Sequence, residues 1–177
     1  MTLLSVAFTC RPAFAEPEWS SSIIAGVAGI GNESAWERTR FYGALRGEAL
    51  FFRANRRNFG LGPALEIGTA GFDDARFLGS AVFLAPVGEF LAVSVAPGAF
   101  VRTSSQGAVA GLSGRAFFGM HAYGYSDYAL NGGLVAGFDR DLGGPGENAI
   151  VIGAQVDGLI LALPVLLLVA WAHGSSD

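Results

Sequence analysis

The fold is decided by the stretch from residue 41 to residue 53, which reads FYGALRGEALFFR. Its residues alternate between two faces. Phe41 and Leu45 belong to an apolar face, whereas Arg46 and Glu48 lie together on the other face. A repeat of two residues is typical of a β-strand, because successive side chains of a strand point to opposite sides. The stretch is therefore predicted to be a strand with one apolar and one sparsely charged face.

The same alternation returns along the rest of the chain. It is present in residues 59–69, 112–122, 130–139 and 150–157. In each segment one face is apolar, and the other consists mainly of small residues with a few charges. The water-facing side of a soluble sheet would carry many more polar residues. An apolar exterior around a narrow polar interior is instead the pattern of an outer-membrane β-barrel.

The composition agrees with a narrow barrel in a single domain. The chain has 177 residues, of which 51% are hydrophobic, only 15% are charged and 26 are glycine; the mean hydropathy is +0.44. A disordered chain would need low hydrophobicity and high charge, and collagen would need glycine at every third position. The net charge is −4, and the 11 basic residues form no basic stripe. We therefore expect no binding to nucleic acid, which requires neutralisation of phosphates.

Seven clusters of Gly, Pro, Asn, Asp and Ser divide the chain, and these residues favour turns. Seven turns predict eight strands, an even number, as in bacterial single-chain barrels. In lipid every backbone amide must be paired within the protein, so the sheet must close on itself. We therefore predict an all-β fold, a closed antiparallel up-and-down eight-stranded transmembrane β-barrel. The expected strands cover about residues 20–30, 39–53, 59–70, 76–86, 89–102, 107–123, 128–140 and 148–162.

The first fifteen residues, MTLLSVAFTCRPAFA, have the pattern of a signal peptide. An apolar run at 3–8 precedes Ala-Phe-Ala at 13–15, the small-residue pattern that signal peptidase requires. We expect residues 1–15 to be removed and residues 16–177 to form the single barrel domain of an exported protein. Cleavage would also remove Cys10, the only cysteine, so no thiol would enter an oxidising compartment. The alternative is that this segment is a buried N-terminal strand.

The strand count, the alternation, the interior charges and the leader together resemble the small outer-membrane barrels, such as the OmpA transmembrane domain and its OmpX-like relatives. The resemblance covers residues 19–162 and implies a Gram-negative outer membrane, contact with its lipids and insertion by the barrel-assembly machinery. Such barrels usually end their last strand with an aromatic residue, whereas here Trp171 is followed by AHGSSD. The apolar segment 158–172 contains Pro164 and is shorter than the ~20 residues of a spanning helix, and its role is left open.

Aromatic residues gather near the expected strand ends, as in the girdles at the two interfaces of a membrane barrel. They are Trp19, Trp36, Phe41, Phe51, Phe52, Phe59, Tyr123, Tyr125, Tyr128 and Trp171. The alternative is ordinary packing of these rings within the sheet.

Polar residues on the inward face form the candidate functional site. The expected interior set consists of Arg46, Glu48, Glu66, Arg115, His121, Asp139, Gln155 and Asp157. Buried charges must be paired, because an unpaired buried charge costs several kcal/mol. We therefore predict an ion-pair network that plugs the barrel of a monomer with a structural or surface-interaction role. The expected partners of Arg46 and Arg115 are Glu48, Glu66 or Asp157. No nucleotide loop, EF-hand or metal-ligand spacing is present, so we expect no cofactor or metal.

Three rival functions are left open. Small barrels include two lipid A-modifying enzymes, a deacylase and a palmitoyltransferase, which use His with Ser and an acid. Ser113 lies about 26 Å from His121 along one strand, whereas Ser126 lies in the next turn, so His121 and Ser126 are the candidate catalytic residues of such a hydrolase or acyltransferase. The interior charges could also line a narrow pore, although eight strands leave little lumen. The third rival is a soluble secreted β-barrel that binds a lipid.

Overall fold

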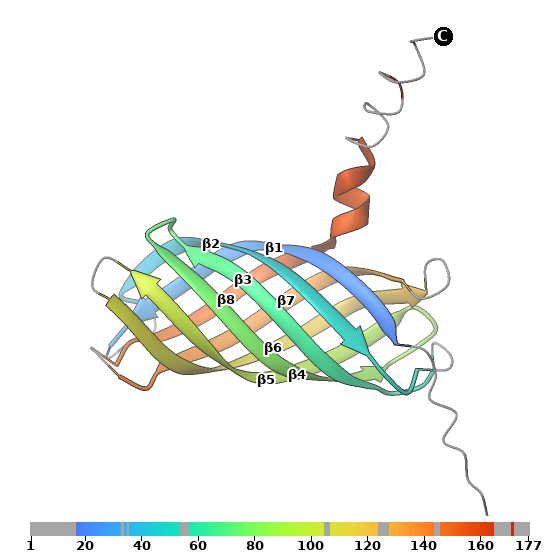
Figure 1. Cartoon of the computed structure of the whole chain (residues 1–177), viewed down its shortest axis with the longest axis horizontal. Coiled ribbons are helices and arrows are strands. Elements are labelled where there is room, and N and C mark those ends of the chain that lie inside the picture. The colour runs from blue at the N-terminus through green and yellow to red at the C-terminus, as the bar shows by residue number, and fades with distance from the viewer. Residues whose placement is uncertain are drawn as a thin grey trace, which may run out of the picture.

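The computed structural model describes residues 17–32, 34, 36–53, 57–104, 107–123, 128–143, 146–164 and 171. It contains eight strands, each antiparallel to the next along the chain, and the last pairs with the first (Figure 1). The strands are β1 (Glu18–Gly31), β2 (Arg38–Leu50), β3 (Gly60–Ala70), β4 (Asp74–Pro86), β5 (Leu91–Ser104), β6 (Gly107–Tyr123), β7 (Ala129–Asp141) and β8 (Asn148–Asp157). The predicted fold class, a closed antiparallel up-and-down barrel of eight strands, is confirmed.

The alternation seen in the sequence sets which side chains enter the barrel. On β2 the buried residues include Tyr42, Arg46 and Glu48, whereas Phe41 and Leu45, on the alternate positions, are about half exposed. The register places Arg46 opposite Glu66 of β3. A shift by one residue would turn every charge outward and every apolar side chain inward, so the pattern specifies the register strongly.

Two apolar clusters lie inside the barrel. The first comes from β1, β2, β3 and β8 and contains Ile24, Ala28, Ile30, Tyr42, Ala44, Ala70, Ala149 and Val151. The second comes from β2 to β5 and contains Leu50, Ala64, Val82, Leu84, Ala92 and Ala96. On β2 the buried Arg46 and Glu48 lie between the two clusters, whereas the end of the barrel where β1 begins also holds the buried polar residues Glu18, Arg53 and His121.

Gly62 shows why the sheet needs glycine at close approaches. A Cβ at this position would collide with the backbone carbonyl oxygen of Ala49 on the neighbouring strand. Only glycine, which has no Cβ, allows the two backbones to lie so close. Gly47 is the opposite case, because a Cβ there would meet no atom within 4 Å.

The end of the last strand differs from the expected one. We expected this strand to run from 148 to 162, but β8 ends at Asp157 and residues 158–164 form a short helix. The carboxylate of Asp157 stabilises the start of this helix, because its Oδ1 accepts the backbone N–H of Leu159 at 2.8 Å, as an N-terminal helix cap does. In the described part of the chain, no helix is both long and apolar enough to cross a membrane.

Candidate functional site

All eight residues of the expected interior set are buried, with at most 8% of each residue exposed. The structure does not gather them into one site. It distributes them over a central ion-pair cluster, a histidine cluster at the end where β1 begins, and a polar group at the end of β8. Strands β2, β6 and β7 each contribute residues to more than one of these groups.

The central cluster is built around Asp139 of β7. Its carboxylate accepts hydrogen bonds from Arg115 Nη1 at 2.6 Å and from the Ser113 hydroxyl at 2.5 Å. It also forms an ion pair with Arg76 of β4, on another part of the wall. Arg115 Nη2 reaches across to Glu66 Oε1 at 3.3 Å. Two guanidinium groups and two carboxylates thus neutralise one another where the barrel excludes water.

Arg46 connects this cluster to the next. Its Nη1 lies 3.5 Å from Glu66 Oε2, and its Nε lies 3.3 Å from Glu48 Oε2. The two expected arginines therefore pair with Glu48, Glu66 and Asp139. Asp157 was also expected as a partner, but in the described structure it pairs with neither arginine.

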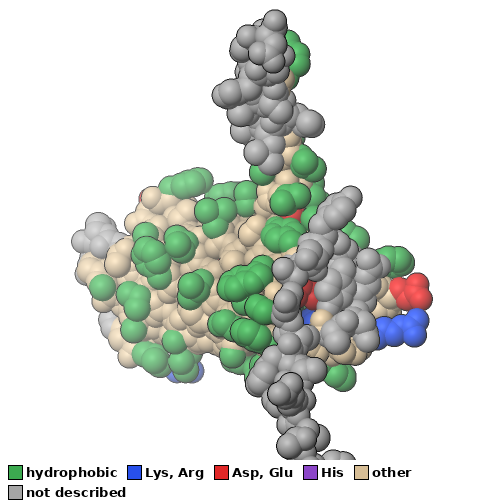
Figure 2. Space-filling view, turned by 45° about the vertical axis from the view of Figure 1, so that its right-hand side comes forward, with side chains coloured by type: hydrophobic (Ala, Val, Ile, Leu, Met, Phe, Trp, Pro, Cys, Tyr) green, Lys and Arg blue, Asp and Glu red, His purple; other side chains and the backbone are tan. Residues whose placement is uncertain are grey.

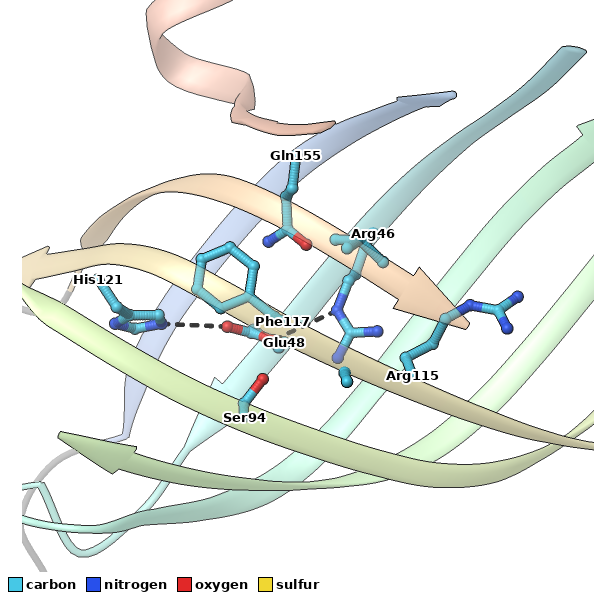
Figure 3. Close-up of a pocket in the computed structure, with 9 residues that line it drawn as sticks. Arg46, Glu48, Ser94, Arg115, Phe117, His121 and Gln155 are labelled. Carbon is cyan, nitrogen blue, oxygen red and sulfur yellow. Dashed lines mark hydrogen bonds and ion pairs between the residues drawn. The ribbon is translucent and has the colours of Figure 1, made fainter. Parts of the chain in front are cut away.

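The histidine cluster places a ring between two carboxylates. Nε2 of His121 lies 3.1 Å from Glu48 Oε1 (Figure 3). Nδ1 of the same ring lies 3.3 Å from Glu18 Oε1. Nδ1 also lies 2.8 Å from Nη1 of Arg53, which itself pairs with Glu18 at 3.3 Å. The Ser20 hydroxyl donates to Glu48 Oε1 at 3.0 Å. Glu48 therefore links the two clusters, since one oxygen faces His121 and the other faces Arg46.

The third group ties the end of β8 to its neighbours. Asp157 is fully buried and accepts the Tyr128 hydroxyl and the backbone N–H of Asn131, both at 3.2 Å. The side-chain amide of Gln155 donates to Asn131 Oδ1 at 3.1 Å. These contacts are neutral or singly charged, so this group holds strands together and does not belong to the ion-pair network.

A further set of ion pairs lies at the opposite rim. Glu147, in the β7–β8 connection, accepts from Arg102 Nη1 at 2.9 Å and also pairs with Arg38. Arg102 Nη2 reaches Asp141 at 2.6 Å. Partial burial works to raise the pKa of Glu147, but the hydrogen bonds and charges of Arg102 and Arg38 outweigh it and hold the pKa below its usual value.

The interior leaves almost no free space beside the charges. A cavity of about 10 Å³ lies among Arg46, Glu48, Arg115, His121 and Gln155, and Figure 3 shows Glu48 between His121 and Arg46, with the Arg115 guanidinium directed away from them. This volume holds one water molecule at most. The ion pairs thus occupy the lumen where a conducting path would have to pass.

The candidate catalytic residues are not brought together in the described structure. Ser126 lies outside the described residues. Ser113 donates to Asp139 and accepts from Arg115, so its hydroxyl belongs to the central cluster. Of the described serines, none is hydrogen-bonded to the ring of His121. A nucleophile needs its base within hydrogen-bond reach, and the described residues do not supply that contact.

Several residues of the network were missed at the sequence level. They are Glu18, Ser20, Tyr42, Arg53 and Arg76. With them, the network contains four arginines and four carboxylates, together with His121. The alternation could have predicted Glu18 and Arg76 as interior residues, since each lies an even number of positions before the next buried residues of its strand.

No group of three or more His, Cys, Asp or Glu in the described part of the chain is arranged to hold a metal ion. No protein-family model matches the chain, and neither a curated protein nor a solved structure is significantly similar to it.

Proposed function

We propose that the chain is a small outer-membrane β-barrel whose interior is plugged by ion pairs, with a structural or surface-interaction role. One observation carries the proposal. The barrel has its charges inside and its large apolar side chains outside, which is the reverse of a soluble protein. The proposal includes export to the outer membrane of a Gram-negative cell and contact with its lipids.

The outer wall supports this proposal through the size of its apolar surface. Leu65 is 70% exposed and Leu134 is 66% exposed, although both lie in the middle of strands. Figure 2 shows apolar side chains spread over the visible wall. Other exposed residues of the same wall are Leu45, Ile67, Phe77, Phe83, Val95, Val101, Leu112, Phe118, Phe138 and Ile152. An apolar surface that continues around several strands is far larger than the isolated patches that soluble monomers expose.

Aromatic side chains at both ends of the wall fit the two membrane interfaces. Trp19 and Phe59 lie at one end and are 56% and 72% exposed; Trp36 and Phe72 lie at the other end and are 46% and 78% exposed. The eleven residues of β3 and Gly71 separate Phe59 from Phe72. At the usual rise and tilt of barrel strands, β3 spans a height of about 26 Å, close to the ~25 Å apolar band of such barrels.

The interior argues against the rival functions. A soluble barrel that binds a lipid needs an internal pocket of about 300 Å³ or more, whereas the cavity beside Glu48 measures about 10 Å³. The same small volume leaves no water-filled path for a pore. A hydrolase or acyltransferase would need a serine on His121, and the described serines do not provide one.

Fractionation combined with gel mobility tests the proposal. Cells that express the full chain are separated into soluble, inner-membrane and outer-membrane fractions, and each fraction is run on a gel with and without boiling. We expect the protein in the outer-membrane fraction, with a faster band when unheated, because a closed barrel stays folded in cold detergent. Recovery in the soluble fraction, with equal mobility before and after boiling, would contradict the proposal.

A further inference from the structure

The last strand stops short of the barrel end. The register places Asp157, the final residue of β8, opposite Ser22 of β1. Residues 18–21 of β1 continue beyond this point, where an isolated bridge joins Trp19 directly to Tyr128. At the level of residues 18–21, β8 is therefore absent from the wall, and β1 lies next to the start of β7.

Side chains seal this short seam. The Tyr128 hydroxyl lies 2.9 Å from the Ser21 hydroxyl and accepts the backbone N–H of Ser21 at 3.2 Å. The same hydroxyl donates to Asp157 at 3.2 Å. A strand that lacks its neighbour would leave this N–H unpaired in lipid, so Tyr128 replaces the missing partner.

The chain leaves the wall at the seam as a helix. Asp157 caps the first turn through the N–H of Leu159, and residues 158–164 then point away from the wall, across the long axis of the barrel (Figures 1 and 2). The exit point lies at the level of Ser22, three residues inside Trp19. Three residues of strand measure about 10 Å. The helix therefore begins closer to the middle of the membrane than the aromatic side chains at this end of the barrel.

Every side of this helix is apolar and open. Leu159, Ile160, Leu161 and Leu163 are each between 43% and 46% exposed. Successive helical residues are turned by about 100°, so these four side chains point in different directions around the axis. The barrel thus covers no single face of the helix, and each face requires an apolar environment.

We infer that helix 158–164 lies within the lipid of the leaflet next to the seam, as an in-plane anchor beside the barrel. This inference rests on the membrane location proposed above. A helix suits lipid better than an extended segment, since most of its backbone groups pair with one another and the Asp157 carboxylate accepts one of the free N–H groups at its start. A protein partner fits less well, because a partner would cover one face of the helix, whereas the described apolar side chains on all its faces are exposed to a similar extent.

Spin labels at three positions test the location of the helix. Leu161→Cys reports on the helix, Leu65→Cys on the outer wall and Gly143→Cys on the exposed β7–β8 connection, each in the full chain with Cys10→Ser. Each variant is refolded into phosphatidylcholine vesicles and checked for heat-modifiable mobility. Collision with oxygen, which concentrates in lipid, is then compared with collision with a water-soluble nickel chelate.

We expect the labels at 161 and 65 to collide several-fold more with oxygen than with nickel, and the label at 143 to show the reverse. A nickel-accessible label at 161 beside an oxygen-accessible label at 65 would overturn the inference and leave the membrane barrel standing. A label at 161 shielded from both reagents would assign the helix to a protein contact and also overturn it. Nickel access at both 161 and 65 would refute the membrane barrel itself.

Discussion

Removal of the carboxylate at the centre of the ion-pair network should destabilise the barrel strongly. Asp139 binds Arg115, Arg76 and the Ser113 hydroxyl. In Asp139→Ala, Arg115 keeps Glu66 at 3.3 Å. Arg76 loses its only carboxylate partner in the described part of the chain. It is 5% exposed and keeps a cation–π contact with the ring of Phe100.

The expected loss follows from this stranded cation. A buried charge that loses its partner typically costs about 3–5 kcal/mol of the free energy of unfolding. The double variant Asp139→Ala, Arg76→Leu removes the stranded guanidinium as well. We expect it to recover about 2 kcal/mol of that loss, because a buried ion pair can be replaced by apolar side chains at little cost.

Urea titration of the refolded barrel in detergent micelles measures these values, with tryptophan fluorescence and gel mobility as parallel probes of unfolding. Asp73→Ala is the control, since Asp73 pairs with Arg40 at the exposed rim and such a pair contributes less than about 1 kcal/mol. A loss below 1 kcal/mol in Asp139→Ala, or a double variant less stable than the single one, would refute the account of the network.

Three further predictions concern other parts of the chain. Gly62→Val should cost at least about 2 kcal/mol of unfolding free energy, because its Cβ meets a neighbouring backbone, whereas Gly47→Val should not; equal urea midpoints would contradict this. His121→Ala should leave the lipid A of expressing cells unchanged in mass spectra, and an altered acyl pattern that depends on His121 would instead indicate an enzyme. Glu147 has a lowered pKa, so its ion pairs stabilise the barrel above the unfolded pKa of about 4.3 and are lost as the pH falls through the folded value. The unfolding temperature of Glu147→Gln should therefore fall less between pH 6 and pH 3 than that of the native chain, and identical decreases would count against the rim pairs.

Much of the fold follows from the alternation in the sequence. The face that carries Arg46 and Glu48 is the inward face of β2, and the same reasoning placed the eight expected interior residues at buried positions. The alternation fails at Arg53 because the chain bends just before it. Phe52 has a φ of +66°, a conformation outside the strand region, and the bend turns Arg53 toward Glu18.

The pairing inside the network could not be derived from one strand at a time. Arg76 and Asp139 lie on β4 and β7, which are not neighbours in the sheet. Their contact therefore depends on which strands face each other across the interior of the closed barrel. The end of β8 was missed for another reason. A short apolar run fits a strand and a helix equally well, and the cap at Asp157, which decides between them, depends on a single side chain.

Detergent dependence tests the central claim, that the outer wall faces lipid, most directly. The chain is folded in mild detergent, transferred to detergent-free buffer, and followed by circular dichroism and size-exclusion chromatography. We predict a β-rich monomer in detergent that aggregates when the detergent is removed, because large side chains such as Leu65 and Leu134 are then exposed to water. A stable, β-rich monomer in plain buffer would contradict the account.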